Sequence, residues 1–336
     1  MSERAAVILA AGQGTRMRSA KPKVLHEVGG RAMVDWSIAL ARALGCARIV
    51  VVCNPSQATL QAHVAATLGE AAVAIQDTPL GTAHAVQAAA PALADVTGDL
   101  VVLYGDTPLI PAEAIEALFA ELAAGADVGV LGFEASVPGA YGRLITDASG
   151  DLEAIVEARE ATPEQLSVRL CNSGVMAASA PRMLSLLRLV SNDNAKGEYY
   201  LTDIVGLARG EGGRCRAVRC AEADVLGVNS RAELAAAEAA FQARARATAM
   251  ESGVTLIAPE TVYFAHDTEL AADTLVEPHV VFAPGVRVTG PARIRAFSHL
   301  EGATVHAGCE VGPYARLRPG TVLGDAVRIG NFVEVK

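Results

Sequence analysis

The sequence is poor in aromatic residues, which make up 4% of its 336 positions although about half of the residues are hydrophobic. Small aliphatic side chains must supply most of the packing, and a chain of this length predicts two domains. No apolar run reaches the roughly 20 residues that cross a bilayer. The apolar run after Met1–Arg4 ends at Gly12 and is too short for a signal peptide. We therefore expect a cytoplasmic protein that does not enter the membrane.

Motifs for disulfides and zinc are also missing. The six cysteines form no C-x-x-C pair, and the seven histidines show no H-E-x-x-H or H-x₃-H spacing. In a reducing compartment, scattered cysteines behave as small hydrophobic residues. We expect neither a disulfide framework nor a zinc site.

Positive charge is scarce overall but locally concentrated. The net charge of −9 argues against a broad surface for nucleic acid. Four cations nevertheless fall within eight residues: Arg16, Arg18, Lys21 and Lys23. Such a segment in an acidic chain predicts a pocket for a compact, highly charged anion. A solvated loop is the alternative interpretation of the charge pattern alone.

The first 130 residues alternate two kinds of hydrophobic pattern. Buried-strand patterns occupy residues 5–9, 48–52, 73–76, 99–104 and 127–133. Helix-period patterns occupy residues 33–44, 57–68, 82–90 and 112–124. This alternation predicts an α/β, Rossmann-like domain in which a mostly parallel sheet is covered on both faces. Its ligands should bind beyond the carboxyl ends of the strands. Residues 141–157 predict a hairpin turned at 147–150.

The last third of the sequence changes character. Ser230 to Glu233 has the spacing of a capping box, and an Ala/Glu/Arg-rich helix should follow to about residue 251. Apolar residues then recur every six positions, with one shift of phase: Val276, Phe282, Val288, Ile294, Leu300, Val305, Val311, Leu317, Leu323, Ile329 and Val335. This hexapeptide period predicts a parallel β-helix.

These patterns divide the chain into three parts. We expect a catalytic domain over residues 1–229, a linker helix over 230–251 and a partial β-helix over 252–336. The last residue, Lys336, follows a ladder position directly, without the cap that usually covers an open final coil. We therefore expect the sequence to be a piece of a longer protein.

A glycine-rich loop follows the first predicted strand, in the sequence from Leu9 to His26. Backbone N–H groups in such a loop can hold phosphate. A Walker A loop requires G-K-[ST], which is absent. A dinucleotide fingerprint requires a small residue where Met17 stands and an acid near Asn54. G-x-G-T-R followed by Pro22-Lys23 is a more specific pattern.

This loop resembles that of the sugar-nucleotide pyrophosphorylases. With Pro22-Lys-Val-Leu-His26 it resembles the bacterial bifunctional N-acetylglucosamine-1-phosphate uridylyltransferase/glucosamine-1-phosphate acetyltransferase family. The resemblance extends over nearly the whole chain, in the segments 76–84, 104–109, 141–143, 155–157, 171–174, 197–203 and 227–229. A left-handed β-helix also follows the catalytic domain in that family.

The resemblance implies a Mg²⁺-dependent reaction of UTP with N-acetylglucosamine-1-phosphate that gives UDP-N-acetylglucosamine and pyrophosphate. The sugar phosphate itself attacks the α-phosphorus, so catalysis depends on aligning two anions and neutralising their charge. Arg16 and Lys23 would meet the triphosphate. Asp106, which follows a buried strand, and Asn229 would bind Mg²⁺ through oxygen atoms.

The resemblance also implies the remaining binding residues. Those expected to contact the nucleotide, besides Lys23, are Leu9, Ala10, Ala11, Gly12, Gln76, Gly81 and Thr82. Those expected at the sugar are Tyr104, Gly105, Asp106, Gly142, Glu157, Asn172 and Asn229. The amide of Gln76 carries a donor and an acceptor that suit the uracil edge. Tyr199 and Tyr200 are left unassigned, because either ring could belong to the core.

In the hexapeptide region, Arg318 and Lys336 match positions that contact the acetyltransferase substrate in full-length relatives. Acetyl-CoA would be used only in a full-length protein, because the family's catalytic histidine would lie beyond residue 336. We therefore expect uridylyl transfer without acetyl transfer from this chain. The family's β-helices associate as homotrimers, and we expect the same here.

Three alternatives remain at this point. The chain could use another sugar or nucleotide, against which the short gap between Arg16 and Pro22 and the presence of Gln76 argue. It could be a non-catalytic subunit of the kind found in nucleotide-exchange factors, which the complete set of expected site residues disfavours. An NAD-dependent dehydrogenase is disfavoured by the failed dinucleotide fingerprint.

Overall fold

The structure is a computed structural model that describes residues 3–194 and 196–336. It separates into two compact units, each formed by two stretches of chain. Unit 1 comprises the residues up to His26 together with Ala32–Glu233, and unit 2 comprises Glu27–Arg31 together with Leu234–Lys336. The division into residues 1–229, 230–251 and 252–336 stays a proposal about domain organisation. None of the helices in the described residues is long and apolar enough to cross a membrane.

Unit 1 is built on one sheet with the strand order β11-β7-β10-β6-β1-β4-β5. Its strands are β1 (Arg4–Leu9), β4 (Cys46–Cys53), β5 (Val73–Ile75), β6 (Asp99–Tyr104), β7 (Val128–Glu134), β8 (Arg143–Thr146), β9 (Leu152–Val156), β10 (Leu170–Ser179) and β11 (Cys215–Cys220). Strand β10 runs antiparallel between β6 and β7, whereas β1 pairs in parallel with β4 and β6. The predicted mostly parallel sheet is therefore confirmed, and β8 and β9 form the predicted hairpin.

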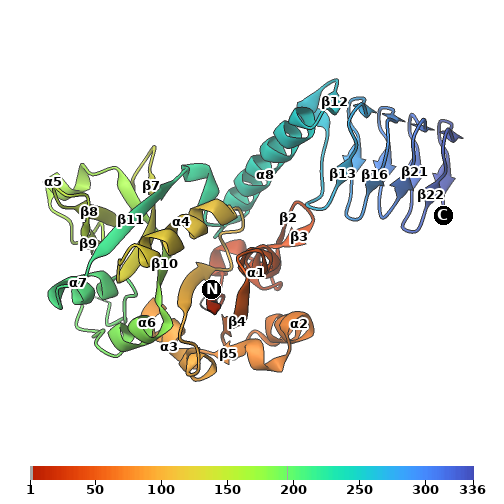
Figure 1. The fold of residues 1–336 in the computed structure, drawn as a ribbon. Coiled ribbons are helices and arrows are strands. Elements are labelled where there is room, and N and C mark those ends of the chain that lie inside the picture. The colour runs from red at the N-terminus through yellow and green to blue at the C-terminus, as the bar shows by residue number, and fades with distance from the viewer. Residues whose placement is uncertain (1–2, 195) are drawn as a thin grey trace. The chain divides into compact units, whose positions relative to one another are not determined.

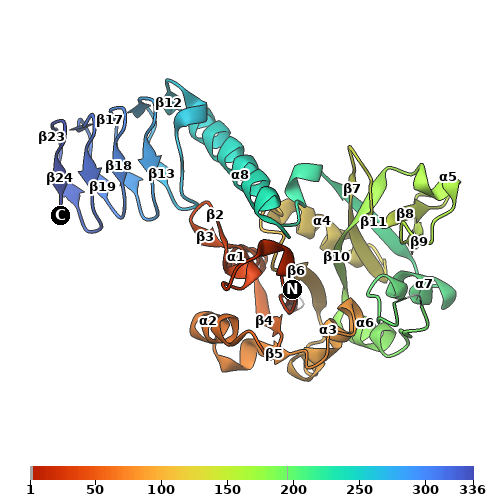
Figure 2. The ribbon, with the colours of Figure 1, turned by 180° about the vertical axis from the view of Figure 1, so that it is seen from behind.

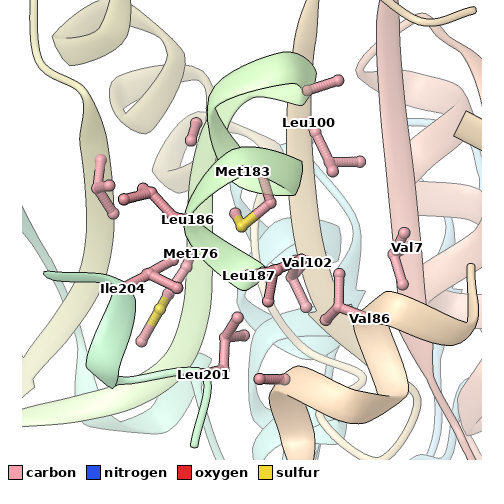
Figure 3. Packing of buried hydrophobic residues seen from close by; sticks show 14 of the residues in the cluster. Val7, Val86, Leu100, Val102, Met176, Met183, Leu186, Leu187, Leu201 and Ile204 are labelled. Atoms are coloured by element: carbon pink, nitrogen blue, oxygen red, sulfur yellow. The ribbon is translucent and has the colours of Figure 1, made fainter. Parts of the chain in front are cut away.

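Helices cover both faces of this sheet (Figures 1 and 2). They are α1 (Met33–Ala43), α2 (Ala58–Leu68), α3 (Thr82–Ala88), α4 (Ala112–Ala123), α5 (Pro163–Leu166), α6 (Ala180–Leu187) and α7 (Asp203–Gly210). Successive side chains of β6 point to opposite faces, as the strand pleat requires. Leu100 and Val102 pack with α3, α6 and α7, as Figure 3 shows in part. Val101 and Leu103 pack with α1, α2 and α4. The two apolar layers hold the strand ends, and hence the loops that follow them, in fixed positions.

Unit 2 contains most of helix α8 (Arg231–Glu251) and a left-handed parallel β-helix. Its strands are β12 (Thr255–Leu256), β13 (Glu269–Leu270), β14 (Leu275–Val276), β15 (Val281–Phe282), β16 (Arg287–Val288), β17 (Arg293–Ile294), β18 (His299–Leu300), β19 (Thr304–Val305), β20 (Glu310–Val311), β21 (Arg316–Leu317), β22 (Val322–Leu323), β23 (Arg328–Ile329) and β24 (Glu334–Val335). These two-residue strands stack into three sheets. Each residue of the predicted hexapeptide ladder ends one strand and faces the interior cluster.

The phase shift in the hexapeptide pattern has a simple structural cause. Val276 pairs with Ile294, whereas Val288 pairs with Val305. The coil that contains the shift is one residue shorter, yet its strands keep their register with the neighbouring coils. The shortening is therefore absorbed at a corner, and the apolar ladder continues without interruption.

One corner of the β-helix carries a stack of exposed rings. They belong to His279, Phe297, Tyr314 and Phe332, and successive ring centroids lie 4.9, 4.9 and 5.1 Å apart. All four residues have φ values between 56° and 60°, in the left-handed region that residues other than glycine seldom adopt. Stacking between coils offsets part of that backbone cost, because each ring contacts the next at a distance typical of aromatic pairs.

The turn between the short strands β2 (Glu27–Val28) and β3 (Arg31–Ala32) belongs to unit 2, which sequence analysis did not foresee. The Gly29 N–H donates to the Glu238 carboxylate of α8 at 2.7 Å. The Gly29 carbonyl accepts from the His266 N–H at 2.8 Å. A segment close to the N-terminus is thus tied to α8 and to the first coil of the β-helix.

Candidate active site

A cavity of about 640 Å³ lies in unit 1, beyond the carboxyl ends of β1, β5 and β6. Its lining includes most of the residues expected from the sequence: Leu9, Ala10, Ala11, Gly12, Lys23, Gln76, Gly81, Thr82, Tyr104, Asp106, Glu157 and Asn172. These residues come from segments far apart in the sequence. They meet here because parallel strands present their carboxyl ends at one edge of the sheet.

Lys23 is the centre of the charged end of this cavity. Its side chain is 9% exposed, and its Nζ donates to the Asp106 carboxylate and, at 2.9 Å, to Asn229 Oδ1. A backbone bond from Val228 N–H to the Asp106 carbonyl, 2.9 Å long, brings the segment of Asn229 to the end of β6. Two oxygen atoms from distant segments therefore converge on one cation. Oxygen donors of this kind suit a hard divalent ion, which commonly takes one or two protein ligands besides phosphate and water.

The glycine-rich loop is held by side chains that sequence analysis did not select. Asn54 Nδ2 donates to the Ala11 carbonyl at 3.2 Å, and Gln57 Nε2 donates to the Gly12 carbonyl at 3.1 Å. Both carbonyl oxygens are therefore engaged by the protein, which lowers the negative potential that an incoming phosphate would meet. Asn54 could have been selected from the sequence because it directly follows β4, whose carboxyl end lies at the same edge of the sheet as the glycine-rich loop.

Position 14 requires glycine for two reasons: its backbone conformation and its closeness to Lys23. Its φ is +62°, and a Cβ atom there would lie 2.6 Å from Cβ of Lys23. The loop therefore packs directly against the first carbon atoms of the Lys23 side chain, where a larger residue than glycine would collide. Arg16 lies in the short 3₁₀ helix Thr15–Met17, and its side chain is exposed. Arg16 is absent from the described cavity lining, so its expected contact with the triphosphate stays a prediction.

Another part of the cavity lining is organised around Gln76, which is 6% exposed. Its Nε2 donates to the Gly81 carbonyl at 3.0 Å and lies 3.2 Å from His84 Nδ1. The amide hydrogens are thus directed at the protein, and the Oε1 acceptor is the atom left for a ligand. A Cβ atom on Gly81, whose φ is +111°, would approach the Tyr199 carbonyl oxygen to 2.5 Å. Thr82 Oγ1 accepts from the Leu201 N–H at 3.0 Å.

Glu157, Asn172 and Tyr104, three of the residues expected at the sugar, also line the cavity. Burial raises the pKa of the Glu157 carboxyl, while Lys196 opposes that rise. Asn172 donates its N–H to the Gly142 carbonyl at 2.8 Å, and its Oδ1 accepts from the Gly174 N–H at 2.8 Å. Burial raises the pKa of Tyr104 as well, so that ring is a neutral phenol at ordinary pH. Gly105 contributes a backbone bond from its N–H to the Leu9 carbonyl at 3.0 Å.

Several lining residues were missed by sequence analysis. They are Gln13, Val24, Pro79, Ala85, Lys196, Glu198, Tyr200 and Thr202. Four of them fall in or beside the segment 197–203, whose resemblance was noted without assigning roles. Tyr200, left open between core and site, is now placed in the cavity lining. Three expected residues, Gly105, Gly142 and Asn229, are absent from the described lining. Each is a direct neighbour of a lining residue: Gly105 lies between Tyr104 and Asp106 in the chain, Gly142 accepts from the Asn172 N–H, and Asn229 accepts from Lys23.

In unit 2, Arg318 and Lys336 occupy equivalent positions in neighbouring coils, since Leu317 pairs with Val335. Arg318 lies 3.7 Å from the Glu334 carboxylate, and both side chains are exposed. Lys336 is exposed too. The two expected anion-contacting cations therefore lie on the same edge of the β-helix.

Comparison with known proteins supports this description of the chain. The sequence matches the MobA-like NTP transferase domain family over residues 6–181. It is 63% identical over 316 residues to the bifunctional protein GlmU of Hyphomonas neptunium, covering 94% of this chain and 68% of that protein. It is 52% identical over 338 residues to the bifunctional protein GlmU of Azorhizobium caulinodans, covering 100% of this chain and 75% of that protein. The chain belongs to the bifunctional GlmU family.

The fold agrees with this membership. The inositol-1-phosphate CTP transferase from T. maritima superposes with a TM-score of 0.55 at 19% sequence identity, covering 69% of this chain and 92% of that one. At that identity the likeness shows the fold alone. Together, the GlmU family and the NTP transferase domain identify the chain as a nucleotidyltransferase. The family resemblance expected from the glycine-rich loop is thus confirmed.

Proposed function

We propose that this protein transfers UMP from UTP to N-acetylglucosamine-1-phosphate in the presence of Mg²⁺, giving UDP-N-acetylglucosamine and pyrophosphate. The reaction would supply precursors of the cell envelope, in the cytoplasm. The observation that carries the proposal is the convergence of Lys23, Asp106 and Asn229 at the sheet edge, beside a glycine-rich loop. Such a site suits two phosphate groups that repel each other and must be brought together.

Asp106 and Asn229 are the residues that would hold Mg²⁺. Their fit to a cation is supported by the present position of Lys23 Nζ, which both oxygens accept from. Bound there, Mg²⁺ would neutralise charge on the phosphates. Lys23 would then turn toward the α-phosphate, and the loop over residues 9–12 would hold the remaining phosphates with its backbone. Arg16 would meet the triphosphate from the exposed side of the loop.

Uracil selection is assigned to Gln76. Because its Nε2 is engaged by Gly81, its Oε1 would accept a hydrogen bond from N3–H of uracil. Cytosine has an unprotonated N3 and would place two acceptors against each other. Gly81 and Thr82 would then contact the base, with Gly81 allowing the backbone to pass close to the ring.

Gln76→Ala should therefore lower the preference for UTP over CTP by about tenfold, the size of one lost hydrogen bond in a buried site. The midpoint of the Mg²⁺ titration should not change, since the metal site is untouched. The measurement is kcat/KM for both nucleotides. Gln165→Ala, in the capping box of α5, is a control outside the cavity. Unchanged selectivity in Gln76→Ala would contradict the assignment.

The sugar phosphate is assigned to the part of the cavity that Glu157, Asn172 and Tyr104 line. A carboxylate and an amide can bind hydroxyl groups and an acetamido group together. Gly142 lies next to this wall, and its lack of a side chain leaves room for a ring. In the second activity of the family, Arg318 and Lys336 would bind the phosphate of the acetyltransferase substrate, and acetyl-CoA would be the acetyl donor.

We also propose that the protein is a homotrimer assembled through the β-helix. The flat sheets of that unit expose side chains on every coil, which supports lateral packing between copies. Light scattering at micromolar concentration should give three times the mass of one chain. A monomer at that concentration would contradict the prediction.

Pyrophosphate release is the direct test of the proposed reaction. The protein should release pyrophosphate with UTP, Mg²⁺ and N-acetylglucosamine-1-phosphate, and far more slowly with glucose-1-phosphate. Omitting the metal should abolish release. A protein that binds both substrates but releases no pyrophosphate would instead fit a non-catalytic scaffold.

A further inference from the structure

The part of the cavity assigned to the sugar phosphate has a cation that neither the sequence motifs nor the proposed metal site uses. Lys196 lines the cavity together with Glu157, Glu198 and Tyr200. The other lysine of the described lining, Lys23, is already engaged by Asp106 and Asn229. Two carboxylates, those of Glu157 and Glu198, thus share the cavity lining with one exposed lysine.

The backbone that carries Lys196 is fixed by Asn194. Asn194 Oδ1 accepts from the N–H groups of Lys196 and Glu198 at 3.1 and 3.3 Å, and its Nδ2 donates to the Glu198 carbonyl at 2.6 Å. The Lys196 Nζ lies 5.8 Å from the centre of the Tyr200 ring, within the range of a cation–π contact. The Asn194 side chain therefore fixes the backbone of this turn, and the exposed Lys196 side chain extends from it toward the Tyr200 ring.

Lys196 and Glu157 line the same cavity. The lysine lowers the pKa of the Glu157 carboxyl against the effect of burial, so the two charges sense each other. No direct ion pair joins them among the residues that the structure describes. The space between a donor and an acceptor that both line one cavity suits a group that can accept from the first and donate to the second.

We propose that Lys196 and Glu157 together bind one hydroxyl group of the sugar: the lysine donates to the hydroxyl oxygen, and the carboxylate accepts the hydroxyl proton. The ligand class is a hexosamine 1-phosphate with that hydroxyl free. This inference rests on the proposed function and adds a specificity residue to it. A deoxy or O-alkyl sugar cannot satisfy both partners, and it leaves a partly buried charge without its hydrogen bond.

The test is a thermodynamic cycle that combines one change in the protein with one change in the substrate. We would measure kcat/KM at saturating UTP for N-acetylglucosamine-1-phosphate and for its 3-, 4- and 6-deoxy analogues, with the wild-type protein and with Lys196→Met. The wild type should lose about tenfold or more on one analogue, as expected for a hydrogen bond to a charged group. Lys196→Met should lose a similar factor on the parent sugar and much less on that same analogue. The KM for UTP should not change.

Two further variants separate a contact from a general effect of charge. Lys196→Arg keeps the donor and should restore part of the activity on the parent sugar. Arg159→Met removes an exposed cation from the segment next to Glu157, outside the described cavity lining, and should behave as wild type. Equal losses on all analogues in Lys196→Met, or no loss at all, would overturn the paired contact. A wild-type protein that releases no pyrophosphate from the parent sugar would instead refute the proposed function.

Discussion

Asp106→Ala should lower kcat by two to three powers of ten while leaving the fold intact. The carboxylate follows β6 at the cavity edge and accepts from Lys23, so it contributes charge and little packing. Removing one such electrostatic contact in a partly water-excluded site typically costs about 3–4 kcal/mol of transition-state stabilisation. Higher Mg²⁺ should be needed for the remaining activity, because one of the two proposed protein oxygens is gone.

The measurement is kcat and KM for UTP across a Mg²⁺ titration, with thermal unfolding as the control for folding. Asp95→Ala removes an exposed carboxylate that pairs with Arg48 and should be close to wild type in rate. If Asp106→Ala keeps a near wild-type kcat at the same Mg²⁺ midpoint, the metal-ligand assignment is wrong. Asp106 would then serve only the turn after β6.

Lys23→Ala should lower activity about as much as Asp106→Ala does. It should, however, bind the metal more tightly, whereas Asp106→Ala should need more Mg²⁺. Loss of the buried cation that we propose to meet the α-phosphate should lower kcat/KM for UTP by about two to three powers of ten. In the structure, however, the ammonium group occupies the oxygens of Asp106 and Asn229. Without that competition, Mg²⁺ or Mn²⁺ should bind the nucleotide-free protein more tightly.

Calorimetric titration of the metal into the nucleotide-free variant measures this second effect separately from catalysis. Lys21→Ala, an exposed cation two residues earlier in the same loop, is the matched control and should change neither quantity greatly. Weaker metal binding in Lys23→Ala would show that the lysine does not compete for the two oxygens. The opposite shifts of the Mg²⁺ midpoint in Asp106→Ala and Lys23→Ala distinguish a ligand from a competitor.

The sequence predicted best what repeats at short range. The ladder from Val276 to Val335 was identified because every sixth side chain must face the interior of the coil, and a single missing residue only moved the phase. The strands and helices of unit 1 followed from the same local logic, since burial of one face has a fixed period along the chain.

The sequence predicted less well what depends on distant segments. Lys23 is 83 residues from Asp106 and 206 from Asn229, and no local pattern states that one ammonium group lies between them. Nothing in the local sequence distinguishes Asn54 and Gln57 from other polar residues that follow a strand. Their role is evident only from the structure, in which they donate to the carbonyl groups of Ala11 and Gly12. The predicted capping box is similar: Ser230 Oγ accepts from the Glu233 N–H, but the Glu233 carboxylate accepts from the N–H of Asn229 instead of Ser230.

The stacked rings at the corner of the β-helix give the two units different optical signatures. The chain has one tryptophan, Trp36 in α1, so tryptophan emission reports on unit 1. Phe297 and Tyr314 lie 4.9 Å apart with their planes only 4° from parallel. Rings held so close couple their electronic transitions, which produces near-ultraviolet circular dichroism that vanishes when neighbouring coils separate. Because units with separate cores need not unfold together, tryptophan emission follows the loss of unit 1 alone, whereas the circular dichroism, to which the aromatic residues of both units contribute, follows both.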